Sequence, residues 1–511
     1  MIVLLLAMRI PSLAQPAGGD QGLYLYAAAR IAAGGVMYRD AWDQKPPGIA
    51  FLYSLLLRIW PHESVVPGAD LVAAAAVALL LVVLGRRRYS ANVGYAAASL
   101  FLLLGDPYLH RLGGIYVRGQ TEPFISLAVT AGIVLLAAER RRTLHLIGAG
   151  LCLSAAFWLK YNALAYVLPL GIAAWSWRPA EQRTLRAIAA DMAWIAAAFI
   201  VAGVAVLVWF AAHDSLLHLR IATIDYNIRY SEETYEGAGS AVRYLFVLPF
   251  ERARVDLLWF VGGLGTMLLV LRRPWSGGTL VVLAWTAAAV LSIAVNGSRG
   301  LPNYLVQADP PLALASSAGL ALLVHHGRAV RAVAGILLAL SLWRVGAERP
   351  VWGMRLGGIP EILENLRYDY RAFSGSIDRD AYVARFKGQK HDVEENEKLV
   401  RFIQAHTAPD DHVLVFGFSG GSVGWKSARE SASRFYWSRP VFIEFEAGRP
   451  GYGSAGLLDD VREHPPALVA LQRDEWGSER LFLQTPALNE WLTRGYTLDH
   501  ETPMFSVWRR R

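Results

Sequence analysis

The chain has 511 residues, of which 54% are hydrophobic and 18% are charged. Soluble globular proteins carry about 25% charged residues, so this composition excludes an ordinary soluble enzyme. Much of the formal net charge of +8 lies in short clusters beside apolar runs, which is typical of membrane topology rather than of nucleic-acid binding. The single cysteine, Cys152, excludes an internal disulfide and a cysteine-based metal site.

Long apolar runs predict a polytopic α-helical membrane protein, because about 20 apolar residues span a bilayer as a helix. The first run, "MIVLLLAMRIPSLA", is short, and we expect the first helix to be either short or truncated by a late start codon. About eleven spans are expected, at 1–13, 68–84, 91–105, 120–138, 144–159, 161–177, 190–212, 254–271, 278–295, 303–324 and 328–345.

Five arginine-rich links between these spans, such as "GRRRYS" and "ERRRT", all fall on one side of the membrane when eleven spans are counted. Positive charge marks the cytoplasmic side. We therefore expect a multi-pass protein of the inner or plasma membrane with a cytoplasmic N-terminus. The predicted organisation is a transmembrane domain over 1–347, with a first outer loop at 14–67, and a periplasmic or extracellular α/β domain over 348–511.

The first outer loop contains a charged segment between two short helices. The segment "QGLYLYAAARIAA" has a helical pattern that ends at Gly34-Gly35, and a second helix begins after Pro46-Pro47. Both helices are too short or too amphipathic to span a bilayer, so we expect them to lie along the outer interface. The charged residues between them would then lie at the outer membrane surface.

Four charged residues of this loop are candidates for chemistry. Asp20 begins the first helix, where an N-cap role is the simpler reading and a functional role does not conflict with it. Asp40, Asp43 and Lys45 lie in "YRDAWDQKPPG", which reads either as a solvated loop or as a stiff loop that holds a lysine at the level of a lipid-borne phosphate.

Later outer segments contribute further candidates. Glu122 is at the start of a span. It either interacts favourably with the helix dipole or faces an outer cavity that it shares with the charged residues of the first outer loop. Lys160 lies between two short spans, where it either binds a ligand or extends to the headgroups. Arg299, Asn303 and Tyr304 lie in "NGSRGLPNYLVQADPP" and could face that cavity as well.

The C-terminal region alternates helical and β-type segments. "VEENEKLVRFIQAHT" predicts an amphipathic helix with Asp392 as N-cap and Glu395 three residues later. "HVLVFGF", "PVFIEF", "ALVALQ" and "MFSVWRR" predict strands. "GFSGGSVG" resembles a phosphate loop, but its spacing differs from the dinucleotide fingerprint, which favours a plain glycine-rich turn.

The order of these features resembles the C-type glycosyltransferases, and more closely the bacterial branch related to protein O-mannosyltransferases and lipid A aminoarabinose transferases. The residues that carry the resemblance are Asp20, the pattern "Y.D..D.KPPG" from Tyr38, Glu122 and Lys160. The C-terminal "ARESASRFYWSRPV" also resembles the external domain of bacterial members. The family commonly has Glu where this chain has Gln21, and His where it has Asn303.

The resemblance implies the C-type glycosyltransferase fold and an enzyme that moves a hexosyl or pentosyl group from a polyprenyl-phosphate donor to a hydroxyl acceptor on the outer face, with inversion. It implies that Asp20 is the general base. Cations on the same side would offset the charge of the leaving phosphate. The expected donor contacts are Lys45, Lys160, Arg299 and Tyr304, and the expected acceptor or supporting residues are Asp40, Asp43, Glu122 and Asn303.

The expected partners are the lipid-linked sugar, the membrane, and a glycan, lipid or protein acceptor, without nucleic acid. The sequence predicts no metal ligands and leaves a divalent cation open. Two alternatives remain: a membrane transporter or flippase, and a non-enzymatic component of polysaccharide assembly. A transporter commonly shows repeated halves with broken helices, and no such repeat is evident.

Overall fold

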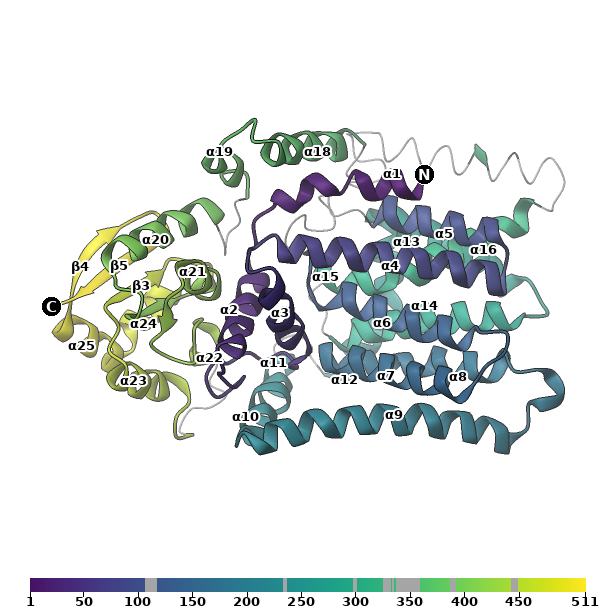
Figure 1. The fold of residues 1–511 in the computed structure, drawn as a ribbon, viewed down its shortest axis with the longest axis horizontal. Helices are drawn as coiled ribbons and strands as arrows, with labels where there is room; N and C mark the ends of the chain where they lie inside the picture. Colours follow the sequence, from purple (N-terminus) through teal and green to yellow (C-terminus); the bar gives the residue numbers. More distant parts are fainter. Residues whose placement is uncertain are drawn as a thin grey trace. The chain divides into compact units, whose positions relative to one another are not determined.

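The structure, a computed structural model, describes residues 1–105, 117–232, 237–296, 301–324, 332, 335–336, 359–386, 392–442 and 449–511. The chain forms two compact units, and Figure 1 colours the chain by residue number. Unit 1 comprises 1–14, 67–208 and 230–373, and unit 2 comprises 15–66, 209–229 and 374–511. The first outer loop therefore shares a unit with the C-terminal residues, whereas the sequence-based division at residue 347 groups it with the transmembrane helices.

Unit 1 is a helical bundle in which α13 packs along α16, α6 along α7 and α5 along α16 (Figure 1). Its elements and those that cross its boundaries are α1 Ile2–Ala7, η1 Ile10–Ala14, α4 Val65–Arg88, α5 Ala91–Leu104, α6 Thr121–Leu136, α7 Thr143–Leu159, η4 Tyr161–Tyr166, α8 Val167–Ser176, η5 Ala180–Gln182, α9 Leu185–Ala212, α12 Ala238–Val255, α13 Leu257–Leu271, α14 Gly277–Val295, α15 Pro302–Leu305, η7 Val306–Ala308, α16 Asp309–Val324 and α18 Ile359–Phe373.

Three helices of the described chain are long and apolar enough to cross a membrane: Val65–Arg88, Leu185–Ala212 and Gly277–Val295. A fourth span results if Gly239–Arg254 and Leu257–Leu271, which meet at a bend of 117°, are counted as one broken helix. These helices support a polytopic helical membrane protein.

Shorter apolar helices coincide with four other predicted spans, at Ile2–Ala14, Ala91–Leu104, Thr121–Leu136 and Thr143–Leu159. The eleventh predicted span, 328–345, lies outside the described residues apart from three positions. The total of eleven spans therefore stays a prediction.

Unit 2 combines helices of the first outer loop with an α/β fold. Its elements are α2 Asp20–Ala32, α3 Gly48–Ile59, α10 Leu216–Arg220, η6 Ile221–Asp225, α11 Tyr226–Glu232, α19 Arg379–Val383, α20 Val393–His406, β1 His412–Phe416, α21 Gly420–Ser427, β2 Glu430–Ser431, α22 Arg439–Phe442, α23 Gly453–Glu463, β3 Leu468–Gln472, α24 Ser478–Gln484, α25 Pro486–Gly495, β4 Tyr496–Glu501 and β5 Phe505–Arg510.

The five-stranded sheet has the order β2-β1-β3-β5-β4. β1 pairs in parallel with β2 and β3, and β5 pairs antiparallel with β3 and β4. The helix α20 covers the core through Leu399 and Ile403, which are almost fully buried. Asp392 caps this helix as predicted, because its side chain accepts a hydrogen bond from the Glu395 amide at 3.2 Å.

Three of the four predicted strands are strands in the structure, β1, β3 and β5. The prediction of a strand in "PVFIEF" is wrong over its described part, because Arg439–Phe442 forms the helical turn α22. The apolar character of this segment reflects burial of Pro440 and Val441 in the unit rather than pairing in the sheet.

Candidate active site

The helix α2 begins one residue earlier than an Asp20 cap requires. Gly19 occupies the N-cap position, and Asp20 is the first helical residue. The backbone of Gly19 has φ 58° and ψ −132°, a conformation that glycine adopts without the penalty of a Cβ atom. The reading of Asp20 as the N-cap of this helix is therefore wrong.

Asp20 instead pairs with Lys45. The Lys45 ammonium lies 3.4 Å from Asp20 Oδ2 and 4.9 Å from the centre of the Tyr24 ring. The Asp20 side chain is 30% exposed and the Lys45 side chain 14% exposed. The pair is thus long and partly open, so both groups can reach a bound molecule.

The loop before α3 holds Lys45 through its backbone. The Lys45 amide donates to Asp43 Oδ1 at 3.2 Å, and the Tyr38 hydroxyl donates to the Lys45 carbonyl at 2.8 Å. Asp43 is 1% exposed. Burial, together with the nearby Asp20, raises the pKa of the Asp43 carboxyl despite the opposing effect of Lys45.

Asp40 acts within its own turn rather than beside Lys45. It accepts hydrogen bonds from the Val36 amide at 2.7 Å and from the Arg39 guanidinium at 2.9 Å. The structure therefore brings Asp20, Asp43 and Lys45 together and gives Asp40 a local structural role.

The segment "GFSGGSVG" does not form a dinucleotide-type phosphate loop. Its second half begins α21, which packs against the first turns of α2. A Cβ on Gly22 would lie 1.8 Å from Ser422 Oγ, and a Cβ on Gly421 would lie 2.8 Å from Leu23 Cα. The glycines thus allow two helix backbones to meet directly beside Asp20.

Tyrosine side chains reinforce this contact. The Tyr26 hydroxyl accepts from the Ser431 amide at 2.8 Å, and the Tyr436 hydroxyl donates to the Leu23 carbonyl at 3.2 Å. The rings of Tyr26 and Tyr436 lie 4.4 Å apart. These contacts explain why the first outer loop belongs to the same unit as the sheet.

A second carboxylate–lysine pair lies in unit 1. The Lys160 ammonium donates to Glu122 Oε1 at 2.6 Å and lies 3.8 Å from the centre of the Tyr304 ring. The Glu122 side chain is fully buried and the Lys160 side chain is 13% exposed. Glu122 Oε2 has no hydrogen-bond partner among the described residues.

Local helix ends bring this second pair together. Glu122 lies in the first turn of α6, and Lys160 has extended backbone at the end of α7. Asn303 precedes Tyr304 in the short helix α15 and is partly buried. Arg299 lies outside the described residues, so its predicted role stays a prediction.

Sequence reasoning missed Gln307, which supports Tyr304. Gln307 Oε1 accepts from the Tyr166 hydroxyl at 2.9 Å and from the Ser292 hydroxyl at 2.7 Å. Its amide nitrogen donates to the Tyr304 carbonyl at 2.9 Å. The sequence feature that could have indicated this role is a glutamine inside the predicted span 303–324, because polar side chains in membrane segments usually bind to one another across helices.

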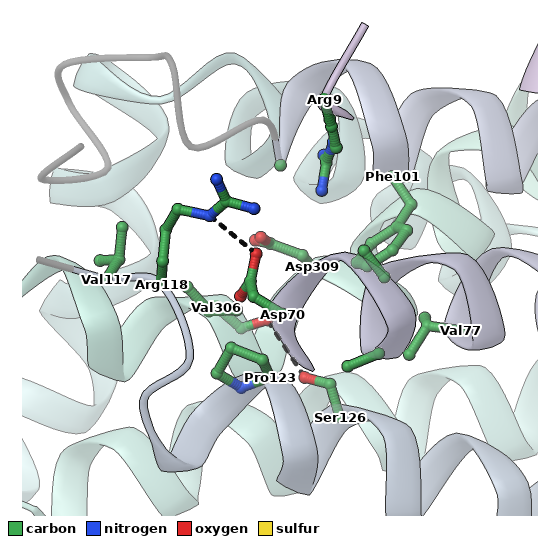
Figure 2. Close-up of a pocket in the computed structure, with 13 residues that line it drawn as sticks. Arg9, Asp70, Val77, Phe101, Val117, Arg118, Pro123, Ser126, Val306 and Asp309 are labelled. Carbon is green, nitrogen blue, oxygen red and sulfur yellow. Dashed lines mark hydrogen bonds and ion pairs between the residues drawn. The ribbon is translucent and has the colours of Figure 1, made fainter. Parts of the chain in front are cut away.

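Sequence reasoning also missed a buried charged cavity of about 40 Å³ in unit 1 (Figure 2). Arg118 donates to Asp70 at 3.1 Å, and the Gly119 amide donates to the other Asp70 oxygen at 3.1 Å. Arg9 and Asp309 also line the cavity, and Figure 2 shows their side chains around the Arg118–Asp70 pair. The bonds from Asp70 to Arg118 and to the Gly119 amide fix the backbone just before Glu122. The sequence feature that could have indicated this cavity is the charge of Asp70 at the start of an apolar run.

Comparison with protein-family models and with curated proteins gives no match. Comparison with solved structures does. The structure of ArnT from Cupriavidus metallidurans bound to undecaprenyl phosphate matches with a TM-score of 0.60 and 13% identity, over 99% of this chain and 96% of ArnT. The apo state of the same protein matches with a TM-score of 0.59, 13% identity and the same coverage.

The chain has the C-type glycosyltransferase fold. AglB from Archaeoglobus fulgidus, in complex with an inhibitory peptide and a dolichol-phosphate, also matches, with a TM-score of 0.47 and 11% identity over 100% of this chain and 74% of AglB. The fold that the sequence motifs resembled is thus confirmed by the ArnT likeness. At 13% identity, the likeness of this C-type fold to ArnT establishes architecture and leaves the chemistry to be argued from the residues.

Proposed function

We propose that the protein is an integral-membrane glycosyltransferase that moves a hexosyl or pentosyl group from a polyprenyl-phosphate donor to a hydroxyl acceptor on the outer face of the membrane. The observation that carries the proposal is the open Asp20–Lys45 pair on a C-type fold. Undecaprenyl phosphate is the lipid bound to ArnT, which supports the same class of carrier here.

Asp20 is assigned as the general base. A base must lie within about 3 Å of the proton that it removes. The Asp20 carboxylate is partly exposed and can therefore approach an acceptor hydroxyl. Asp43 is nearby but almost fully buried, so it supports Lys45 rather than contacting the acceptor. Direct attack of the hydroxyl on the anomeric carbon inverts its configuration.

Lys45 and Lys160 are assigned to the donor phosphate. The leaving polyprenyl phosphate gains negative charge as the glycosidic bond breaks, and fixed cations lower the energy of that state. Lys45 is placed by the stiff Pro46-Pro47 segment, and Lys160 by Glu122 and the Tyr304 ring. Arg299 is the third proposed cation. Glu122 is proposed to support the site by holding Lys160 in place.

A transfer assay tests the proposal. The purified full chain is supplied with a synthetic polyprenyl-phosphate sugar and envelope extract, with and without a chelator that reports any divalent-cation requirement. Transfer is expected, and Lys45→Met is expected to weaken donor-lipid binding while the protein still folds. Absence of transfer by the wild type would contradict the transferase proposal. Normal donor binding by Lys45→Met would contradict the phosphate role of Lys45. Mass analysis of polyprenyl lipids and surface glycans in a deletion strain identifies the sugar.

The proposed orientation has its own test. A reporter that is active only outside the cytoplasm is expected to work when fused after residue 350 and to fail when fused near Arg141, because the arginine-rich links are assigned to the cytoplasm. The reverse pattern would place Asp20 and Lys45 on the wrong side for an outer-face transferase.

A further inference from the structure

The carboxyl ends of the three parallel strands of unit 2 meet beside α2. The order β2-β1-β3 means that the chain leaves β1 toward a neighbour on one side and later returns to its other side. In open α/β sheets such a reversal leaves a crevice at the carboxyl ends of the strands, where ligands bind. The proposed base, Asp20, is the first residue of α2, which packs against α21, the helix that follows β1.

Aromatic rings gather at the carboxyl ends of these strands, and the segment after each strand contributes one ring. Phe418 follows β1, Trp437 follows β2, and Trp476 follows β3. The Trp476 ring lies 5.0 Å from that of Phe418 and 6.2 Å from that of Trp437. Trp437 is 2% exposed, whereas Phe418 and Trp476 are partly exposed.

Charged and polar groups surround these rings. The Arg439 guanidinium lies 5.4 Å from the centre of the Trp476 ring. Asp474 Oδ2 accepts from the Phe418 amide at 3.2 Å, which joins the loops after β1 and β3. The loop after β3 also lines an open groove of about 350 Å³ with Arg473, Asp474, Glu475, Gly477, Glu479 and Arg480.

The aromatic group is linked directly to the proposed active site within unit 2. The Trp437 indole donates to the Trp42 carbonyl at 3.3 Å, and Trp42 precedes Asp43. On the other side, α21 starts beyond Phe418 and meets α2 at Gly22. A ligand on the rings would therefore lie next to the segments that carry Asp20 and Lys45.

We propose that Phe418, Trp476 and Arg439 bind a pyranose ring of the acceptor, and so present an acceptor hydroxyl to Asp20. The inference rests on the proposed transferase function. The C–H face of a pyranose is apolar and stacks on an aromatic ring, while its hydroxyls need donors and acceptors at the rim. The partly exposed rings supply the apolar contact, and the Arg439 guanidinium beside Trp476 supplies donors at the rim. The loop that carries Trp476 supplies further charged groups, which line the groove.

Saturation-transfer NMR with a panel of methyl hexopyranosides, added to the detergent-purified full chain, tests the site. Wild-type protein is expected to saturate the C–H protons of the pyranose, and Trp476→Ala to lose the signal. Trp491→Ala is the matched control, because the Trp491 ring lies 4.8 Å from that of Tyr496. Tyr496 pairs with Arg510, and the neighbouring Arg509 pairs with Leu468 at the amino end of β3, away from the carboxyl ends of the strands. Arg439→Gln provides a second, milder variant if Trp476→Ala does not fold.

The transfer assay provides the second readout. Trp476→Ala is expected to raise the KM for the acceptor by about tenfold or more with little change in kcat, while Trp491→Ala matches the wild type. Equal saturation in all variants, or an unchanged acceptor KM in both Trp476→Ala and Arg439→Gln, would overturn the site and leave the transferase proposal standing. Glycoside binding without any transfer by the wild type would overturn the transferase proposal alone.

Discussion

Two of the carboxylate–lysine pairs, Asp20–Lys45 and Glu122–Lys160, differ in length and in the exposure of the carboxylate. Asp20 and Lys45 lie 3.4 Å apart with the carboxylate 30% exposed, whereas Glu122 and Lys160 lie 2.6 Å apart with the carboxylate fully buried. A short buried pair is costly to separate, and a longer open pair is weak enough to exchange partners. The comparison therefore predicts that the first pair can open when a substrate binds, whereas the second pair stays closed and presents Lys160 as a fixed cation.

The largest expected effect comes from breaking the buried pair. Lys160→Met leaves the Glu122 carboxylate buried without its cation, which is expected to lower the free energy of unfolding by about 3–5 kcal/mol. Thermal unfolding in detergent measures the loss. Lys45→Met is the control, because its open pair should contribute about 1 kcal/mol or less.

The double variant Lys160→Met/Glu122→Gln should recover most of that stability, since it removes the unpaired charge. Its donor-lipid affinity then reports the phosphate role of Lys160 apart from folding. Equal stability of Lys160→Met and Lys45→Met would erase the distinction between the two pairs.

The second effect concerns turnover. Asp20→Asn is expected to reduce kcat on the order of 10²-fold or more, because an amide cannot accept the proton. Donor affinity should persist. Since Asp20 is not the cap, the variant should lose its favourable helix-dipole interaction, about 0.3–1 kcal/mol, and its partly exposed ion pair with Lys45, about 1 kcal/mol or less. Near-normal sugar transfer by Asp20→Asn would move the base to Asp43 or Glu122.

A smaller effect is expected at the helix contact beside Asp20. Gly22→Ala places a Cβ within 2.7 Å of the Ser422 backbone nitrogen, which cannot move as a side chain can. The expected cost is about 1–3 kcal/mol, as for overpacked cores, together with reduced turnover. Ser422→Ala is the control that removes only the hydroxyl. If Gly22→Ala unfolds like the wild type, the helices are less tightly joined than described.

The smallest effect is a change in pH dependence. Burial raises the pKa of Asp43 above its ordinary value of 3.8. At pH values between the two, the Asp43 carboxyl therefore binds more protons in the folded protein than in the unfolded chain. The contribution of Asp43 to stability is therefore greatest at low pH and is lost as pH rises through its raised pKa. Asp43→Asn should flatten this fall and exceed the wild-type unfolding temperature at pH 7. If the unfolding temperatures of the wild type and of Asp43→Asn change in parallel from pH 4 to 8, that account of Asp43 is contradicted.

Local sequence patterns were sufficient for several features. The Asp392 cap, the turn at Gly34-Gly35 and the start of α3 after Pro46-Pro47 follow from short-range chemistry, and all appear in the structure. The order of acidic and lysine residues was enough to predict the C-type fold. Lys160 and Glu122 were each flagged separately as unusual charges.

Other features depend on contacts between residues that are distant in the chain. The pairing of Glu122 with Lys160, or of Arg118 with Asp70, cannot be read from either residue alone. The glycines of "GFSGGSVG" signalled a special backbone, but only the structure shows that their partner is Gly22, some 400 residues earlier. Asp20 was misplaced by one residue because Gly19 is also an acceptable N-cap.

The two edges of the sheet have a consequence for acceptor recognition. Over the described residues, one edge is β2, which has only two residues. The other edge is β4, which carries a register shift between Leu498 and His500 and charged side chains such as Asp499. Short, irregular and charged edges resist pairing with a further strand. An extended peptide would find little regular backbone to join at these two edge strands, which agrees with the proposal that side chains of this unit bind the acceptor.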